Sequence, residues 1–323
     1  MNTAVSPARV RSYESKDESL WDEMIASAHA ATFLHTRRFL NYHGNRFCDL
    51  SVVLEGEDGR LVGVFPAALD PGDDSCVISH PGITYGGIVH DGGLYGDRMV
   101  TVLQAIAEHY RAAGYRTLRY KAVPHIYHRV PGQDDLYALF RVGAKRYRCD
   151  LSATIDLVFR QAPKERRKRG QKKAERVGVV VDEGSNYVAG LWRVLTENLA
   201  RKFQTKPVHS LEEILLLYSL FPRNIEFVVG ILGGNIEGGV VLFYGSSVAH
   251  AQYIASSEAG SDACVLDAVF QFSIEAAAKK GMRYFDFGIS NENDGRLLNQ
   301  GLYQFKREFG AGGVVHEFYE IGL

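Results

Sequence analysis

The chain has 323 residues, of which 46% are hydrophobic and 23% are charged, a composition typical of a globular protein of about two domains. Its net charge is -1, so the chain as a whole carries no electrostatic attraction for nucleic acid. The four cysteines have neither the spacing of a metal site nor the density of a disulfide framework. We therefore expect reduced thiols and no bound metal.

The first residues, MNTAVSPARVRSYESKDESLW, lack the apolar core of a signal peptide. No later apolar run approaches the ~18 residues that are needed to cross a bilayer. These features predict a cytoplasmic protein without a membrane segment.

The first half begins with a predicted hairpin at residues 50–69, where two apolar runs flank a turn that contains glycine. The glycine-rich run at 80–93 is expected to allow close backbone packing, because no GxGxxG sequence opens a helix there. Residues 120–140 then combine aromatic, histidine and proline residues. Their polar side chains are candidate acceptor contacts, or else they belong to a turn packed on the domain interface: Lys121, His125, Tyr127 and His128.

An internal repeat organises the chain. A helix that ends at a glycine and leads into a strand occurs twice, and its two glycines, Gly114 and Gly281, lie 167 residues apart. A second motif, LY followed by GA, recurs at nearly the same offset, at residues 136–144 and 302–311. Each half is thus expected to contain, in order, a hairpin, a strand, a helix, a strand, a helix and a final strand. This order predicts an α/β fold with a mixed (α+β) sheet. We place the two domains at residues 1–150 and 151–323.

The junction segment, residues 160–176, is strongly basic, with nine Lys or Arg and two Glu. One interpretation is a solvated helix face. The other is a phosphate-binding patch beside the interdomain cleft, suited to a nucleotide diphosphate or to RNA. The absence of interleaved aromatic residues argues against a platform for stacking single-stranded nucleic acid.

Residues 198–214 are expected to contribute to an acceptor site. A predicted helix carries Asn198 and Lys202, and the next helix begins at the capping-box sequence that starts with Ser210. His209 lies just before that helix and is a candidate general base, because histidine titrates near neutral pH; a structural or surface role is the alternative. Gln252 and Tyr253, on a later strand, either orient an acceptor or have a purely structural role in the sheet.

A polar loop follows that strand and is a candidate donor site. The N–H groups and dipole at the start of the next helix suit a pyrophosphate. Alternatively, Ser261 or Asp262 is the N-cap of that helix. Cys264 follows and is expected to be buried packing. The predicted donor-binding residues are Ser256, Ser257, Gly260, Ser261 and Asp262.

Residues 284–311 combine an apolar strand, a polar loop and a short helix. Asp286 lies among aromatic residues of the strand and Lys306 lies on the helix, so the pair serves either catalysis or a structural ion pair. Acyl transfer to an amine needs a neutral amine, donors for the developing oxyanion and a route for the proton. We take Asp286, Lys306 and His209 as catalytic candidates, and Ser290 and Asn299 as substrate contacts.

Together, the duplicated unit and the motifs KKAERVGV, QYIASSEAG, YFDFGIS and GLYQFKREFGA resemble the FemAB-type tandem members of the GNAT acyltransferase superfamily (Acetyltransf_6 type). The nearest resemblance is to the FdhC-like nucleotide-sugar N-acyltransferases. The resemblance implies two tandem GNAT-like domains, and strands at 248–256 and 284–290 that splay apart to bind the donor. It also implies a lysine of the FK motif, here Lys306, at the reaction centre.

One departure concerns the donor loop. GNAT proteins usually carry Gln or Arg and two spaced glycines there, whereas this loop has only Gly260. The donor is therefore expected either to bind atypically or to differ from CoA.

We accordingly expect an N-acyltransferase that moves an acyl group from acyl-CoA to the amine of a nucleotide-linked amino sugar (dTDP- or UDP-amino-deoxyhexose). It would serve bacterial surface polysaccharide synthesis, such as the lipopolysaccharide O-antigen. The first half would be a degenerate copy that forms one wall of the acceptor site. Direct attack by the amine is expected, since no cysteine has an evident base beside it. The alternatives are an aminoacyl-tRNA-dependent ligase of cell-wall precursors and a non-catalytic nucleotide-sugar binding protein.

Overall fold

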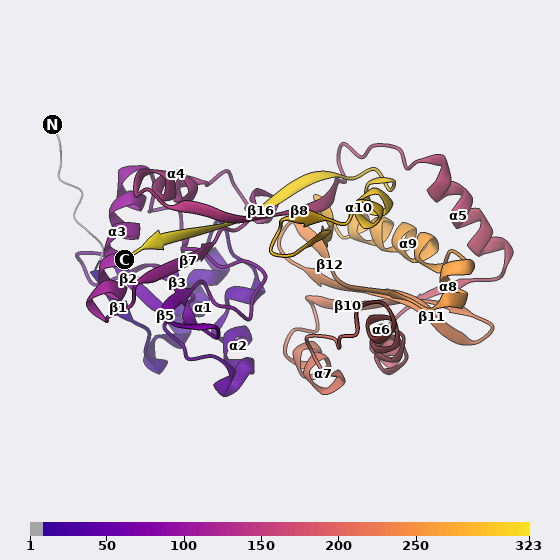
Figure 1. Cartoon of the computed structure of the whole chain (residues 1–323), viewed down its shortest axis with the longest axis horizontal. Coiled ribbons are helices and arrows are strands. Elements are labelled where there is room, and N and C mark those ends of the chain that lie inside the picture. Colours follow the sequence, from indigo (N-terminus) through magenta and orange to yellow (C-terminus); the bar gives the residue numbers. More distant parts are fainter. Residues whose placement is uncertain (1–8) are drawn as a thin grey trace. The chain divides into compact units, whose positions relative to one another are not determined.

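The computed structural model describes residues 9–323, which divide into two compact units (Figure 1). The first unit runs to Asp150 and also includes residues 293–297 and 315–323. The second unit consists of residues 151–292 and 298–314. The division falls at Leu151 along the chain, but the last nine residues return to the first unit.

The first unit contains two sheets. One is antiparallel in the order β1-β2-β3-β6, and the other contains β4, β5, β7 and the end of β16. β5 and β7 are parallel, whereas β7 and β16 are antiparallel. The strands are β1 (Arg9–Ser12), β2 (Val52–Glu55), β3 (Leu61–Phe65), β4 (Ala68–Asp70), β5 (Asp73–Ile78), β6 (Val89–His90) and β7 (Thr117–Lys121). The helices are α1 (Glu18–Ser27), α2 (Arg37–Leu40), α3 (Asp97–Ala112) and α4 (Asp134–Arg141), with 3-10 turns at Ser15–Asp17, Phe33–His35, Asn41–Arg46 and His125–Tyr127.

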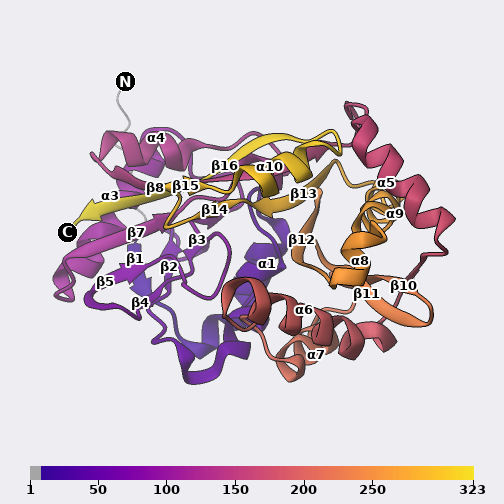
Figure 2. The same ribbon diagram turned by 45° about the vertical axis from the view of Figure 1, so that its right-hand side comes forward.

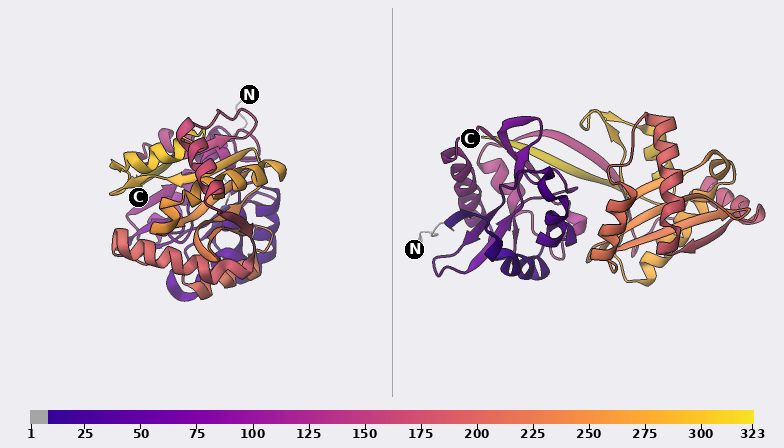
Figure 3. Two further views of the ribbon diagram at one scale, coloured as in Figure 1. Left: turned by 90° about the vertical axis from the view of Figure 1, so that its right-hand side faces the viewer. Right: turned by 90° about the horizontal axis from the view of Figure 1, so that it is seen from below.

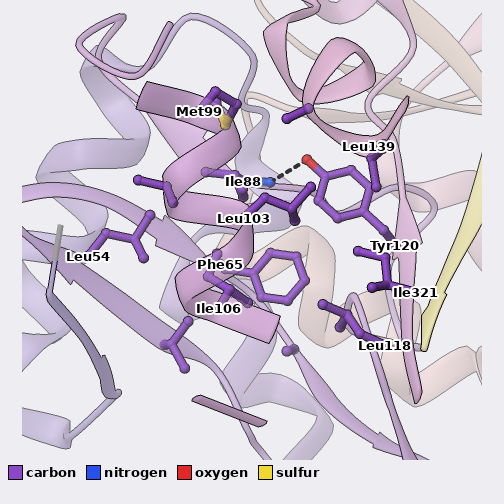
Figure 4. Packing of buried hydrophobic residues seen from close by; sticks show 14 of the residues in the cluster. Leu54, Phe65, Ile88, Met99, Leu103, Ile106, Leu118, Tyr120, Leu139 and Ile321 are labelled. Atoms are coloured by element: carbon purple, nitrogen blue, oxygen red, sulfur yellow. Dashed lines mark hydrogen bonds between the residues drawn. The ribbon is translucent and has the colours of Figure 1, made fainter. Parts of the chain in front are cut away.

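The core of the first unit packs α3 against β2, β3 and β7 (Figure 4). Tyr120 is fully buried, and its ring stacks on Phe65 at 5.8 Å between centroids. Its hydroxyl accepts a 2.9 Å hydrogen bond from the Ile88 N–H and donates one of 2.9 Å to Asp135. The phenol is thus satisfied inside an apolar cluster, as buried tyrosines require.

The second unit has one mixed sheet in the order β8-β13-β12-β11-β10-β9, antiparallel except for β12 and β13. The strands are β8 (Lys145–Asp156), β9 (Val180–Glu183), β10 (Ile225–Leu232), β11 (Asn235–Tyr244), β12 (Val248–Ser256) and β13 (Tyr284–Ile289), followed by β14 (Asn291–Glu292), β15 (Leu297–Leu298) and β16 (Gly312–Gly322). The helices are α5 (Glu165–Arg176), α6 (Val188–Phe203), α7 (Leu211–Leu220), α8 (Glu258–Asp262), α9 (Val265–Lys279) and α10 (Gln300–Arg307), with a 3-10 turn at Ser185–Tyr187.

Helices cover both faces of this sheet. α9 packs on β10 and β11, while α6 packs on β11 and β12 from the other side (Figures 1 and 3). Phe285 and Phe287 of β13 contact the ring of Phe270 on α9. Because side chains alternate along a strand, Asp286 points to the opposite face. Both units therefore confirm the predicted mixed α/β fold.

The predicted repeat is present in the backbone. Helices α4 and α10 each have eight residues, and α3 and α9 occupy matching places before β7 and β13. Each of the four helices is followed by a glycine with positive φ, the usual left-handed helix end. These glycines are Gly114 (φ 92°), Gly143 (φ 75°), Gly281 (φ 76°) and Gly310 (φ 98°).

The start of the donor-loop helix differs from the prediction. Ser257, rather than Ser261 or Asp262, is the N-cap, since its Oγ accepts from the Gly260 N–H at 2.9 Å. The short α8 then ends, and Cys264 with φ 58° starts α9. Two helices therefore replace the single one expected. Over residues 9–323, no helix has the length and apolar character to span a membrane.

Candidate active site

The pairing between β12 and β13 stops partway along both strands. They are paired in parallel through Val248↔Tyr284, Ala249↔Phe285 and His250↔Asp286. Beyond His250, β12 stays paired with β11, and β13 stays paired with β8. Within the described part of the chain, the facing edges of the two strands therefore separate at His250 and Asp286, which confirms the expected splay.

Asp286 lies at this point of separation with a fully buried side chain. Its Oδ1 accepts hydrogen bonds from the hydroxyls of Ser152 and Thr154, the latter at 2.8 Å. Its Oδ2 lies 2.8 Å from Nδ1 of His250. Three donors thus stabilise a carboxylate that burial would otherwise make costly.

His250 is the functional candidate that the sequence interpretation missed. Its side chain is 14% exposed and stands on the last residue of β12 that pairs with β13. Along the chain it is merely a histidine in an apolar strand. Only the sheet register places it beside Asp286.

Lys306 is buried with 3% exposure and holds a β-bulge in β13. Its Nζ donates to the carbonyls of Gly288 (2.9 Å) and Ile289 (2.7 Å), where the pairing with β8 shifts register between Asp286 and Ile289. Burial lowers the pKa of Lys306 to about 8, against the opposing effect of Asp286. The lysine therefore lies near enough to the carboxylate to interact with its charge, and its amine donates to two backbone carbonyls of the bulge.

A cavity of about 510 Å³ brings the basic segment and the donor loop together. The helix α5 lies against α9 (Figure 2) and contributes one cationic stripe to the cavity. The first turn of α9, with the positive end of its dipole, lies opposite. The lining residues are Arg166, Arg167, Arg169, Gly170, Lys173, Ser256, Gly260, Ser261, Cys264, Leu266, Asp267 and Phe305.

Arg167 anchors α5 to the unit. It is buried, lies 3.1 Å from Asp267 and 3.0 Å from Glu308, and stacks over the ring of Phe305. Gly170 permits this close approach, since a Cβ there would lie 2.4 Å from an oxygen of Asp267. Burial raises the pKa of Asp267 to about 6. Arg166, Arg169 and Lys173 remain exposed around the cavity.

The predicted donor residues divide into two groups. Ser256, Gly260 and Ser261 line the cavity, and Gly260 lies against the Glu237 carbonyl so closely that a Cβ would be 2.1 Å from it. Ser257 is used as the cap, and its hydroxyl also donates to Glu237. Asp262 is exposed and is not among the lining residues. Cys264, expected to be buried, is half-buried and lines the cavity, because its left-handed backbone ends α8 there.

Two of the predicted acceptor residues meet on the α6 face. His209 is buried, and its Nδ1 is hydrogen-bonded to the hydroxyl of Tyr253. Trp192 of α6 packs on Tyr253 and donates to the His209 carbonyl at 3.3 Å. His209 is thus part of a packed cluster just before α7.

The remaining predicted contacts of the second unit are dispersed. Asn198 is buried, and its Oδ1 has no hydrogen-bond partner within residues 9–323. Lys202 is exposed on α6, and Gln252 lies at the irregularity between β11 and β12. Ser290 is buried after β13. Asn299 is the N-cap of α10, accepting from the Leu302 N–H at 3.0 Å.

The candidates in the first unit make packing contacts there. Lys121 is buried and donates to the carbonyls of His80 (2.8 Å) and Ile83, and burial lowers its pKa to about 7. Tyr127 packs on Tyr85 at 4.4 Å, and His128 Nε2 lies 2.9 Å from the Val123 carbonyl. These contacts favour the packed-turn alternative. Across residues 9–323, no group of His, Cys, Asp and Glu side chains is arranged to hold a metal.

Comparison with known proteins agrees with this geometry. Residues 159–307, slightly less than half of the chain, match the model of a family described as an acetyltransferase (GNAT) domain. None of the curated proteins matches the sequence. Several solved structures share the fold over nearly the whole chain.

The structure of FemX has a TM-score of 0.68 at 12% identity, covering 98% of this chain and 97% of FemX. The C-terminal domain of an Agrobacterium fabrum protein named as a lysylphosphatidylglycerol synthetase has a TM-score of 0.62 at 12% identity, covering 95% and 91%. A tandem GNAT protein from the clavulanic acid biosynthesis pathway has a TM-score of 0.53 at 12% identity, covering 98% of each chain.

Residues 159–307 are similar to a GNAT acetyltransferase domain, and this match supports an acyltransferase. Across both units the fold is that of FemX and of tandem GNAT structures. At 12% identity these likenesses show a shared fold.

Proposed function

We propose that the protein is an N-acyltransferase that moves an acyl group from acyl-CoA to the amine of a nucleotide-linked amino sugar. The observation that carries the donor part is the cavity between α5 and α9. Three exposed cations, Arg166, Arg169 and Lys173, surround it, and such groups bind phosphate through charge-assisted hydrogen bonds. CoA supplies a diphosphate and a further phosphate to meet them.

The splayed strands give the donor a path from this cavity to the reaction centre. Ser256 lines the cavity at one end of the free edge of β12, and His250 stands at the other. This stretch spans ~20 Å at ~3.3 Å per residue. A pantetheine arm lying along it could pair with unpaired backbone groups and present its thioester next to His250, Asp286 and the bulge held by Lys306.

The acceptor would enter on the α6 face of the sheet. The His250–Asp286 pair and the His209–Tyr253 pair both come from this face. The buried Oδ1 of Asn198 offers a further polar contact. The amino-sugar part of the proposal is supported by the sequence resemblance to nucleotide-sugar N-acyltransferases. The reaction is direct attack of the amine on the thioester.

Aminoacyl transfer from tRNA is the second candidate. It is favoured by the shared fold with FemX and with a protein named for lysylphosphatidylglycerol synthesis. It is also favoured by a second stripe of α5, formed by Lys168, Lys172 and Arg176, which is exposed and does not line the cavity. RNA binding by these residues would depend steeply on salt.

The test is a panel of acyl-CoA donors and of dTDP- and UDP-linked amino sugars, followed by free thiol release and product mass. Sugar-dependent thiol release with the mass of an amide is the expected result. Acyl-CoA hydrolysis without product, or sugar binding without turnover, would contradict the proposal. Transfer from aminoacyl-tRNA but not from any acyl-CoA would establish the second candidate.

A further inference from the structure

The burial of Asp286 is unusual for a strand inside an apolar core. Phe285 and Phe287 on either side of it are both buried against α9. A buried charge is costly, and an apolar residue usually serves stability as well or better. Three hydrogen-bond donors are nevertheless gathered around this carboxylate. Such an arrangement calls for a role that an apolar side chain could not fill.

The hydrogen bonds also determine which nitrogen of His250 carries the proton. Ser152 and Thr154 both donate to Oδ1 of Asp286, so Oδ2 is left to His250. In its neutral form, a ring that donates from Nδ1 to a carboxylate carries its lone pair on Nε2. A buried carboxylate that fixes this tautomer also stabilises the imidazolium that forms when Nε2 takes up a proton.

The ring of His250 lies where the two strands separate. Gly288, with φ 75°, lies beside the ring: an added Cβ would be 3.4 Å from the His250 Cε1, an ordinary contact distance. The free edge of β12 ends at this residue. A donor arm that follows that edge from the cavity would therefore bring its thioester to the imidazole.

We propose that His250 is the general base of the transfer and that Asp286 is its positioning residue, an inference that rests on the proposed function. The amine nitrogen attacks the thioester carbon, so that a C–N bond forms and the C–S bond breaks. The proton lost by the amine moves to Nε2 of His250. The departing thiolate then takes up that proton, which yields free thiol, the amide and neutral histidine.

Two charged groups near His250 come from elements of the second unit. Asp286 on β13 is bonded to the ring, and Lys306 on α10 lies behind the bulge that contains Gly288. Ser152 and Thr154 of β8, which donate to Asp286, are neutral. Replacing Asp286 would therefore remove the negative charge next to the ring and leave the positive charge of Lys306.

The experiment compares wild type with His250→Gln and His250→Gly, using acyl-CoA and the amine acceptor found in the panel. We expect kcat to fall by ~10²–10⁴-fold in both variants, while CoA binding, measured by calorimetry, stays within about twofold. The acidic limb of the pH–rate profile should disappear, and imidazole should restore activity to His250→Gly. His109→Gln, on α3 of the first unit, is the matched control and should keep the wild-type rate.

A ring-nitrogen NMR measurement gives a second readout that needs no turnover. Wild type should show the Nδ1–H tautomer of His250, and Asp286→Asn should lose it. The Nε2–H tautomer in wild type would overturn the inference. So would a wild-type rate and pH profile in His250→Gln. If the wild-type protein transfers no acyl group to any amine, the proposed function falls and the inference falls with it.

Discussion

The two units place different residues at the same position of one repeated strand pattern. In the first unit, β5 and β7 pair in parallel through three positions that end at Ile78↔Arg119, and Glu320 lies opposite Arg119 on β16. In the second unit, β12 and β13 pair through three positions that end at His250↔Asp286, and Thr154 of β8 lies opposite Asp286. In the first unit, Ile78 and the partly exposed, ion-paired Arg119 thus stand where the second unit has a histidine and a buried carboxylate.

The space beyond this position also differs. In the first unit the backbone fills it, because the Ser79 N–H donates to the Arg119 carbonyl and the Gly86 N–H donates to the Lys121 carbonyl. In the second unit no backbone bond joins β12 to β13 beyond His250, as far as the described residues extend. The comparison teaches that the duplicated backbone was retained in both copies, whereas an open edge with ionisable groups occurs in the second.

The largest difference between the units is expected when the buried carboxylate of Asp286 is replaced. Asp286→Asn is expected to lower kcat by ~10²-fold or more, because the neutral amide no longer stabilises a protonated His250. Arg119→Gln, the matched change in the first unit, breaks partly exposed pairs with Asp70 and Glu320 and should cost at most ~1 kcal/mol of stability. Steady-state kinetics and urea denaturation measure both. Equal loss of activity in the two variants would remove the distinction between the units.

Variants of the cations on α5 test whether the second unit also binds the donor. Replacing Arg166, Arg169 and Lys173 with Ala should weaken CoA binding by ~10–100-fold, since bonds to charged groups contribute ~1.5–3 kcal/mol before solvent screening. Replacing Lys168, Lys172 and Arg176, on the other stripe, should change it by less than about threefold. Calorimetric titration at fixed salt compares the two triple variants. A larger effect of the second set would place the CoA phosphates outside the cavity and contradict the proposed donor site.

Each unit also contains a buried lysine that donates to two carbonyls, Lys121 and Lys306. Their folded-state pKa values, about 7 and about 8, lie below the ordinary 10.5. The unfolded chain therefore binds more protons between about pH 8 and 10.5, and the free energy of unfolding should rise with pH in that window.

The Lys306→Met variant should lose the part of this rise due to Lys306, about 3 kcal/mol, and should be destabilised at every pH because two buried carbonyls lose their donor. Lys121→Met should lose a similar rise that starts nearer pH 7. Denaturation at several pH values measures each difference from wild type. A pH slope in Lys306→Met equal to that of wild type would contradict the depressed pKa.

The helix-terminating glycines provide the smallest and most closely matched contrast. Gly143 and Gly310 end α4 and α10 with positive φ, but a Cβ meets nothing within 4 Å at Gly143, whereas it would lie 2.1 Å from the Gln161 carbonyl oxygen at Gly310. Gly143→Ala should cost ~1 kcal/mol from backbone strain alone. Gly310→Ala should cost ~1–2 kcal/mol more, because the backbone around it must shift. Thermal denaturation of both variants measures the difference.

Local signals were enough to predict much of the fold. Glycine-ended helices and alternating apolar strands have causes within a few residues, so the repeat could be derived from the sequence, whereas the splay of the two strands was implied by the family resemblance. The same strand pattern drew attention to Asp286 as an acid among aromatic residues. Lys306 was identified through the resemblance of its motif.

Contacts between distant segments could not be predicted in the same way. His250 meets Asp286 only through the register of a parallel pair, and no spacing along the chain reports that register. The cavity joins α5 to residues about 90 positions later, so the basic segment and the donor loop were treated as separate features. The helix start was misplaced because several residues of the loop could cap a helix, and tertiary contacts with Glu237 favour Ser257.

The return of the last residues to the first unit has a consequence for synthesis. Residues 315–323 supply the strand that pairs with β7, with Tyr319 opposite Tyr120. The sheet of the first unit therefore stays incomplete on the ribosome until residues 315–323 have emerged, although domains usually fold in order from the N-terminal end. Separate expression of residues 1–150 should accordingly give an aggregation-prone fragment with an unpaired strand edge.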